Sequence, residues 1–295
     1  MAPLIALIGH NGQLGSDLQK VGHEQGRLLI GLGHAEIDIA DPSSVHSALD
    51  ARQPQIVINT AAAHGDWQSG SLSQEAFFKT NALGAWHLAR WCWQNSAILV
   101  HYSTDYVYGA ETTRARPYTE VDAPCPINLY GASKAAGEQL VQAYAPNHYV
   151  CRIASVYGAV GARAKGNSNF VKTTLAKIQR GEAMQVVNDQ MMSPTWTRLV
   201  ALKTYELLDR HAPYGLYHLA GSGACTWYEF AREIVRLVGG GIAVEPIATP
   251  AYRATDIFLR PRYTALDNAN LRRAGLPDLP HWQAALELFL RTEGQ

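Results

Sequence analysis

Residues Pro3-Leu-Ile-Ala-Leu-Ile8 run directly into Gly9-His-Asn-Gly12-Gln-Leu-Gly15. The first stretch is short and apolar, which predicts a buried β-strand. Leu14, Leu18 and Val21 then recur at helical spacing, so the glycines fall at a strand-to-helix turn. Such glycines let the backbone tighten and a pyrophosphate approach, and the helix N-terminus favours its negative charge. This stretch predicts an α/β fold that binds a dinucleotide.

The same alternation of strand and helix continues to about residue 150. Strands are predicted at residues 27–32, 56–63, 98–103 and 148–153, and helices at 45–52, 74–95 and from residue 130 onward. We expect a Rossmann-type, doubly wound parallel sheet with right-handed crossovers. Further helices are predicted at 170–180, 197–210, 227–238 and 282–290, with Thr226 and Glu229 forming a capping box. We expect residues 1–152 to form the NAD(P)-binding domain, with 193–222 returning to it, and 153–295 to be mainly a smaller substrate-binding domain.

Composition excludes several classes of protein. The 25 basic residues balance 25 acidic ones among 295 residues without a long run of either, so no nucleic-acid partner is expected. No apolar run approaches the ~18 residues of a membrane span. The four cysteines are far apart and have no metal-ligand spacing, which predicts a reduced, cytoplasmic protein, and no metal-ligating residues are predicted.

The end of the second strand bears on the choice of cofactor. NAD-selective sites usually place an acidic residue there to bind the adenine ribose. Residue 33 is a glycine, which leaves room for a 2′-phosphate with His34 or Arg27 beside it. We therefore expect NADP, with NADPH preferred and NADH also accepted.

Other residues are expected along the dinucleotide. Asp38 either bonds the adenine amine or only caps a turn, and Ile39 follows it. The small residues after the third strand allow a dinucleotide to lie against the backbone, or else serve helix–sheet packing. The predicted cofactor-binding residues are Gly9, Asn11, Gly12, Gln13, Leu14, Gly15, Asp38, Ile39, Ala61, Ala62, Ala63, Tyr130 and Lys134.

Four further residues carry the chemistry. Thr104 and Asp105 follow the apolar strand at 98–103, and Tyr130 and Lys134 stand four residues apart in a predicted helix. That spacing is about one helical turn, so both side chains project from one face. A tyrosine titrates near ~10, and a nearby ammonium lowers that pKa and makes the phenol a usable acid or base. Thr104 can hydrogen-bond a substrate oxygen that the phenol also reaches.

The predicted helix at 74–95 is rich in aromatic residues. This surplus indicates either core packing or a subunit interface, and the latter would make the protein a homodimer. Asn81 is polar within that run, which predicts a buried hydrogen bond to a neighbouring strand.

These motifs together resemble the dTDP-4-dehydrorhamnose reductase family of the extended short-chain dehydrogenase/reductase superfamily. The likeness spans nearly the whole chain and includes His101-Tyr-Ser-Thr-Asp-Tyr-Val-Tyr108, Tyr130-Gly-Ala-Ser-Lys134, Val187-Asn-Asp-Gln190 and Arg260-Pro261. It implies NADPH-dependent reduction of the C4 keto group of a dTDP-4-keto-6-deoxyhexose, foremost dTDP-4-dehydro-L-rhamnose, in dTDP-rhamnose and polysaccharide biosynthesis. Sugar-nucleotide dehydratases of the superfamily look like Thr-Asp-Glu where this chain has Thr104-Asp105-Tyr106. A tyrosine in place of that glutamate fits simple carbonyl reduction.

The resemblance also implies roles for individual residues. Tyr130 would donate the proton, Lys134 would lower its pKa and bond the nicotinamide ribose, and Thr104 would position the substrate oxygen. The substrate-binding residues would be Thr104, Asp105, Tyr106, Asn169, Gln190 and Arg260, with Arg260 facing the diphosphate or merely lying at the surface.

The chain departs from the family pattern where the sugar should rest, at Gly65-Asp-Trp-Gln-Ser69, Ser155 and Met191-Met192. Two alternatives therefore stay open. One is a reductase of another nucleotide-linked deoxysugar. The other is a non-catalytic regulatory subunit, because the family also resembles the regulatory subunit of methionine adenosyltransferase.

Overall fold

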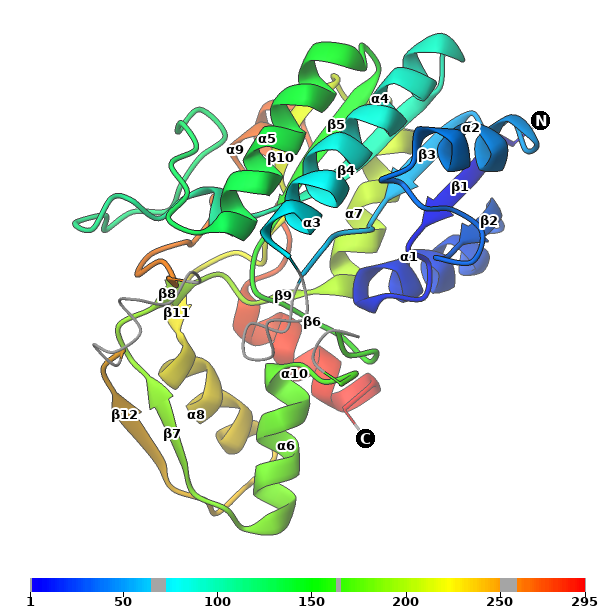
Figure 1. Cartoon of the computed structure of the whole chain (residues 1–295). Helices are drawn as coiled ribbons and strands as arrows, with labels where there is room; N and C mark the ends of the chain where they lie inside the picture. The colour runs from blue at the N-terminus through cyan, green and yellow to red at the C-terminus, as the bar shows by residue number, and fades with distance from the viewer. Residues whose placement is uncertain (1, 65–72, 163–165, 250–258, 295) are drawn as a thin grey trace.

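A six-stranded, entirely parallel sheet forms the centre of the molecule (Figure 1). The computed structural model describes residues 2–64, 73–162, 166–249 and 259–294. The strand order is β10-β5-β4-β3-β1-β2. The strands are β1 (Leu4–Ile8), β2 (Leu28–Leu32), β3 (Ile56–Asn59), β4 (Ile98–Thr104), β5 (His148–Ile153) and β10 (Gly215–His218). The predicted fold class is confirmed, and the order reverses between β1 and β3, where such sheets bind their ligands.

Helices cover both faces of this sheet, which is why its strands are apolar on both sides. On one face α1 (Gln13–Glu24) and α7 (Thr197–Asp209) pack through Leu18, Val21 and Val200. The other face is covered by α2 (Pro42–Asp50), α4 (Ala85–Gln94) and α5 (Leu129–Tyr144), whose buried residues include Leu88 and Val141. The short α9 (Ala269–Arg273) adds Leu271 to the first of these cores.

The helix predicted at 74–95 is broken by a wider turn. It consists of α3 (Gln74–Phe78), the π-helical η1 (Lys79–Gly84) and α4. Asn81 lies in the π-helical segment, and its side chain bonds both backbone groups of Ala63. The predicted buried hydrogen bond of Asn81 is thus confirmed, with the segment just beyond β3 as its partner.

Two predicted boundaries were wrong by three residues or more. Helix α2 begins at Pro42, because the side chain of Asp41 accepts a hydrogen bond from the Ser43 N–H and caps it there. Strand β3 ends at Asn59 rather than at Ala63, since the Asn59 carboxamide bonds the Ala61 N–H and turns the chain.

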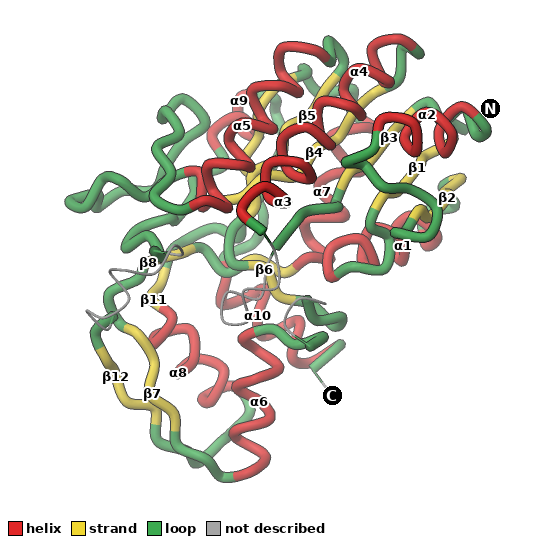
Figure 2. Tube along the Cα trace, viewed as in Figure 1, coloured by secondary structure: helices red, strands yellow, loops and turns green. Residues whose placement is uncertain are grey.

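A second group of elements lies below the sheet in the view of Figure 2. Its aromatic core includes Tyr157, Trp196, Phe230 and Phe289. The elements are α6 (Phe170–Arg180), α8 (Trp227–Leu237), α10 (Trp282–Thr292) and the short strand pairs β7 (Met184–Val187) with β12 (Val244–Ile247), β6 (Val156–Tyr157) with β9 (Thr195–Trp196), and β8 (Met191–Met192) with β11 (Cys225–Thr226). The predicted capping box at the start of α8 is present. Among the described helices, none is both long and apolar enough to cross a membrane.

Candidate active site

The glycine-rich turn between β1 and α1 is closely packed. Gly9 has φ +77°, and its N–H donates to the backbone oxygen of Leu32 at 2.8 Å. A Cβ at position 15 would lie 2.1 Å from the Gly9 backbone oxygen, so only glycine at this position lets α1 pack this closely against the turn. Gly12 provides no side-chain cap for α1. The buried Gln13 Nε2 has no hydrogen-bond partner among the described residues. Uncapped helical N–H groups and a buried donor fit the pyrophosphate of a dinucleotide.

A carboxylate does reach the end of β2, and it comes from Glu36. The Gly33 N–H donates to Glu36 Oε2 at 2.7 Å, and a Cβ at Gly33 would also lie 3.4 Å from Asn11 Nδ2. The inference of an acid-free strand end was therefore wrong, because the turn after residue 33 brings the acid back. Arg27 was also misplaced: it lies at the amino end of β2 and pairs with Asp209 at 2.6 Å.

Asp38, predicted either to bond the adenine amine or to cap a turn, and Ile39, predicted to bind the cofactor, both make contacts within the protein itself. Asp38 Oδ1 accepts from the Ala40 N–H at 2.9 Å and so caps a turn. Ile39 is buried in the core, and its backbone oxygen lies 2.9 Å from His87 Nδ1. Neither contact tests a role toward the cofactor.

The segment after β3 joins the glycine-rich turn to the π-helical η1. Thr60 Oγ1 donates to the backbone oxygens of Ile8 and Gly9 at 2.8 and 3.1 Å. Ala63 is held on both backbone groups by Asn81, whose Nδ2 also lies 3.0 Å from Ser133 Oγ in α5. The three small residues at 61–63 are thus fixed between the first strand and the Tyr130 helix.

Thr104 and Tyr130 meet where β4 ends and α5 begins. Thr104 Oγ1 donates to Asp105 Oδ1 at 3.1 Å, and the Tyr130 phenol lies beside the Thr104 side chain, which lowers the pKa of the phenol against the effect of burial. Asn128 caps α5 by accepting from the Gly131 N–H at 2.8 Å, and its Nδ2 donates to the Leu259 oxygen. The cap therefore fixes the first turn of α5, which carries Tyr130, and ties it to the chain just before Arg260.

Lys134 lies one turn further along α5 and points back at β4. Its Nζ donates to the Tyr102 backbone oxygen at 2.5 Å and lies 3.4 Å from His101 Nε2. Burial lowers the pKa of Lys134 to about 8, and the Glu138 carboxylate opposes the shift. Burial raises the pKa of Tyr130 well above its ordinary value, against the effect of the Thr104 side chain. The lysine nitrogen is directed at β4, and the lowering of the Tyr130 pKa by Lys134 stays a prediction.

Asp105 and Tyr106 extend the site along η2 (Asp105–Val107). Burial raises the pKa of Asp105 to about 6, and hydrogen bonds from Thr264 and Thr104 oppose the rise. The Tyr106 ring meets the Tyr130 ring edge to face with 6.2 Å between centroids. The nearby guanidinium of Arg260 partly offsets the rise in the Tyr106 pKa that burial causes. The structure thus brings Asp105, Tyr106 and Arg260 to the Tyr130 site.

Asn169 and Gln190 are buried in the second group of elements. Asn169 caps α6, accepting from the Lys172 N–H at 3.1 Å and donating to the Gly158 oxygen at 2.9 Å. Gln190 Nε2 donates to Thr249 Oγ1 at 2.8 Å. Both side chains therefore make hydrogen bonds within the protein itself. The segment at 65–69, where the sequence departs from the family pattern, lies outside the described residues.

Sequence reasoning missed three polar residues next to the site: Asn59, His101 and Glu36. Asn59 Nδ2 lies 3.2 Å from His101 Nδ1, and both side chains are buried within apolar strands. A polar residue inside an apolar strand is costly unless it is paired, which was the available signal. Glu36 gave no such signal, because its position depends on a turn.

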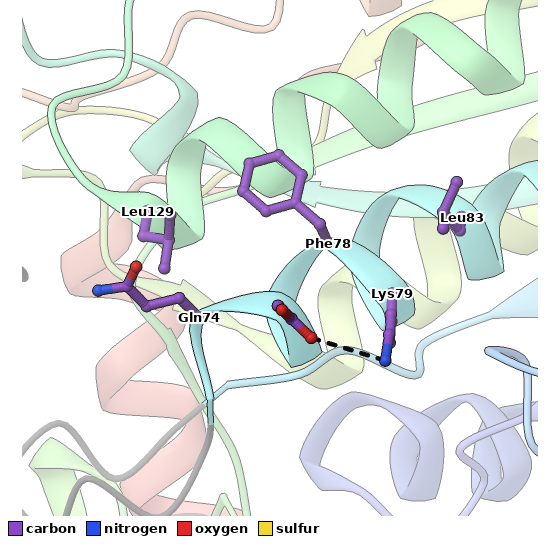
Figure 3. Close-up of a pocket in the computed structure, with 6 residues that line it drawn as sticks. Gln74, Phe78, Lys79, Leu83 and Leu129 are labelled. Carbon is purple, nitrogen blue, oxygen red and sulfur yellow. Dashed lines mark ion pairs between the residues drawn. The ribbon is translucent and has the colours of Figure 1, made fainter.

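A separate pocket of about 370 Å³ lies outside this site, against the broken helix (Figure 3). Phe78 and Leu83 line it from the helix and Leu129 from the start of α5, and an ion pair joins Glu75 to Lys79 at 3.8 Å. Phe78 and Leu83 are exposed, at 39% and 45% of their surface.

Comparison with known proteins gives consistent results over the full length. The family described as RmlD substrate binding domain matches residues 3–294. The chain is 36% identical to a dTDP-4-keto-6-deoxy-D-glucose reductase of Streptomyces niveus, covering 94% of this chain and 93% of that protein. It is 35% identical to a dTDP-4-dehydrorhamnose reductase of Streptomyces griseus, covering 96% and 92%. The crystal structure of dTDP-4-dehydrorhamnose reductase from Bacillus anthracis in complex with NADP matches with a TM-score of 0.89 at 31% identity, over 99% of both chains.

Proposed function

The chain belongs to the RmlD substrate binding domain family, which here matches dTDP-4-dehydrorhamnose reductases, and from this membership we propose that it is an NADPH-dependent reductase of a dTDP-4-keto-6-deoxyhexose. The substrate we propose first is dTDP-4-dehydro-L-rhamnose, which reduction at C4 converts to dTDP-L-rhamnose. The observation that carries the proposal is the meeting of Thr104 with Tyr130 at the carboxyl end of β4, one helical turn from Lys134.

The dinucleotide would lie across the carboxyl ends of β1, β2 and β3. Gly9, Gly12 and Gly15 would admit the pyrophosphate, with Asn11, Gln13 and Leu14 beside it. Asp38, Ile39 and Ala61 to Ala63 would border the adenosine and nicotinamide halves, and Lys134 would bond the nicotinamide ribose. When bound, the reduced nicotinamide supplies the hydride, and the protein supplies orientation and the proton.

The proton comes from Tyr130 in this proposal. Thr104 lies beside the phenol at the end of β4, and we place the ketone oxygen of the substrate within reach of both hydroxyl groups. The phenol is protonated at neutral pH, which is the form that a general acid needs. As negative charge develops on the substrate oxygen, the phenol proton moves to it, and Thr104 stabilises the charge by a hydrogen bond.

The sugar and nucleotide would bind on the side of the second group of elements. We propose that Asp105 and Tyr106 contact the hexose, that Asn169 and Gln190 contact the nucleotide, and that Arg260 binds the diphosphate by charge-assisted hydrogen bonds. In this view residues 1–152 with 193–222 form the cofactor-binding domain, and the remainder of 153–295 is mainly substrate-binding.

The assay follows NADPH absorbance after addition of dTDP-4-dehydro-L-rhamnose made in situ. The proposal predicts NADPH oxidation that requires both the sugar nucleotide and this chain. Oxidation that is independent of the sugar, or absent although NADPH binds, would contradict it.

A second substrate is favoured by the relative from Streptomyces niveus, which is a reductase of dTDP-4-keto-6-deoxy-D-glucose. The same assay with that compound decides between the two. A higher kcat/KM for the D-gluco compound would assign this chain to the second reaction.

We further propose that two copies associate through the exposed apolar residues Phe78 and Leu83 and that the enzyme works in the cytoplasm. Sedimentation of the wild type and of a Leu83→Glu variant tests the first point. Dimerisation predicts a lighter species for the variant, and an equal mass for both would contradict it.

Fractionation of cells that express the chain tests the proposed location in the cytoplasm. Recovery of the chain in the membrane fraction would contradict that location.

A further inference from the structure

Three buried polar side chains form a row between the sheet and the Tyr130 helix. They are Asn59 at the end of β3, His101 in β4 and Lys134 in α5. Asn59 Nδ2 lies 3.2 Å from His101 Nδ1, and Lys134 Nζ lies 3.4 Å from His101 Nε2. They expose 1%, 1% and 2% of their surfaces. Such buried groups have to satisfy one another, so their hydrogens can be placed by counting donors and acceptors.

The orientation of Asn59 is the starting point. Its Oδ1 accepts from the Ala61 N–H at 3.0 Å, and a reversed carboxamide would place two donors against each other there. Nδ2 therefore faces His101 as a donor, and His101 Nδ1 must accept. A neutral imidazole carries one proton, which then lies on Nε2 and points at Lys134.

Lys134 can accept a hydrogen bond from that N–H only as a neutral amine, whose nitrogen has a free lone pair. An ammonium group has three donors and no acceptor, so it would face the His101 N–H donor to donor. Moving the His101 proton to Nδ1 would create the same conflict at Asn59. The Tyr102 backbone oxygen accepts from the amine and the ammonium alike. The row is fully satisfied only when Lys134 is uncharged.

We propose that His101 is a positioning residue, held by Asn59 as the Nε2–H tautomer, that favours the neutral amine of Lys134 by one hydrogen bond. This inference rests on the proposed function, because it concerns the lysine placed behind the proton donor Tyr130. It makes both protonation states of Lys134 accessible, so that the lysine can exchange a proton while Tyr130 loses and regains its own.

The surroundings of Lys134 affect its pKa in opposite directions. Burial lowers its pKa and the carboxylate of Glu138 in α5 raises it, but that carboxylate is paired with Arg152 of β5 at 2.6 Å. Burial and then the Lys134 charge hold the pKa of His101 well below its ordinary value, so the ring stays neutral. One buried hydrogen bond corresponds to a shift of about one pH unit in the Lys134 titration.

The first test is the tautomer of His101 in the intact chain. Nitrogen NMR of protein labelled with ¹⁵N-histidine distinguishes a protonated Nε2 from a protonated Nδ1, and His101→Phe assigns the signal. We expect the Nε2–H form from pH 6 to 9. The Nδ1–H form would overturn the proposal, and this measurement needs no folded variant beyond the assignment.

The second test follows the Lys134 side-chain carbon signal against pH, with Lys134→Met for assignment. His101→Phe keeps a ring but removes the N–H, so the Lys134 titration should rise by about one pH unit. His148→Phe is the matched control, because His148 lies on the adjacent strand and its ring bonds the Ala145 oxygen. An unmoved or lowered titration in His101→Phe would overturn the proposal. Since neither readout uses the sugar, a chain that fails to reduce dTDP sugars would contradict the proposed function and leave these results in force.

Discussion

At the scale of single residues, the proposed chemistry depends on the Tyr130 hydroxyl. Tyr130→Phe should lower turnover by roughly 10²–10⁴-fold, because it removes the proton donor and keeps the ring. The dissociation constant for NADPH, measured by fluorescence titration, should be nearly unchanged. Tyr144→Phe is the control, since Tyr144 is exposed on the same helix. Turnover near the wild-type value in Tyr130→Phe would remove Tyr130 from the role of acid.

Glu36 should limit the preference for NADPH. Its carboxylate sits on the Gly33 N–H at the strand end where the adenine ribose is expected, and a 2′-phosphate would meet its charge. Glu36→Gln should tighten NADPH relative to NADH by about five- to tenfold, the equivalent of about 1 kcal/mol. The ratio of the two dissociation constants measures this effect without any sugar substrate.

Glu24→Gln provides the comparison, because Glu24 is a carboxylate on α1 that pairs with Arg198 at 2.7 Å. Equal NADPH-to-NADH ratios in wild type, Glu24→Gln and Glu36→Gln would place the 2′-phosphate away from Glu36.

Glu36 also marks what the sequence could convey at this scale. The glycines at 9, 12 and 15 and the Tyr130–Lys134 spacing were predictable, because their meaning lies in short-range geometry. Glu36 acts through a turn, and Lys134 points at Tyr102 and His101 because of how α5 packs on β4. Neither fact is encoded in the local pattern.

At the scale of elements, the π-helical turn at 79–84 organises the cofactor side of the site. Asn81→Ala would leave the N–H and oxygen of Ala63 without their side-chain partner, which costs about 2–4 kcal/mol of unfolding free energy. Cofactor affinity should fall as well, because the segment at 61–63 loses its anchor. Urea unfolding and NADPH titration measure the two effects.

The control for this helix is Asn95→Ala. Asn95 Nδ2 donates to the Trp91 oxygen at the far end of α4, away from the site. If Asn81→Ala is no more destabilised than Asn95→Ala, the π-helical turn does not hold the segment.

Element types were predictable from periodicity, but this wider turn was not. Aromatic and apolar spacing over 74–95 indicates one helix, and the extra residue per turn arises only because Asn81 meets the Ala63 backbone in three dimensions. The early end of β3 has the same origin in the Asn59 side chain.

At the scale of the whole molecule, a buried histidine couples the fold to pH. His218 in β10 lies between Tyr108 Oη at 3.2 Å and the Asp267 oxygen at 3.0 Å, and burial lowers its pKa to about 3, with help from Arg152. The unfolded chain binds this proton near pH ~6.5. The stabilising effect is therefore complete above that value and is lost progressively as pH falls toward the folded pKa.

His218→Gln should flatten the dependence of unfolding free energy on pH between 6.5 and 4 by one proton, or about 1.4 kcal/mol per pH unit. Urea unfolding at several pH values gives the slopes. His46→Gln, at an exposed site on α2, should keep the wild-type slope. Equal slopes for the wild type and His218→Gln would show that His218 is not the acid-sensitive group.

The central claim is that this chain transfers hydride from NADPH to C4 of a dTDP-linked keto sugar. The most direct measurement uses NADPH that carries deuterium at C4 of the nicotinamide, prepared separately in its two stereochemical forms, with dTDP-4-dehydro-L-rhamnose made in situ. We predict one deuterium at C4 of the sugar in the dTDP-L-rhamnose formed, from one of the two forms alone. Product without deuterium at that carbon from either form would contradict the account.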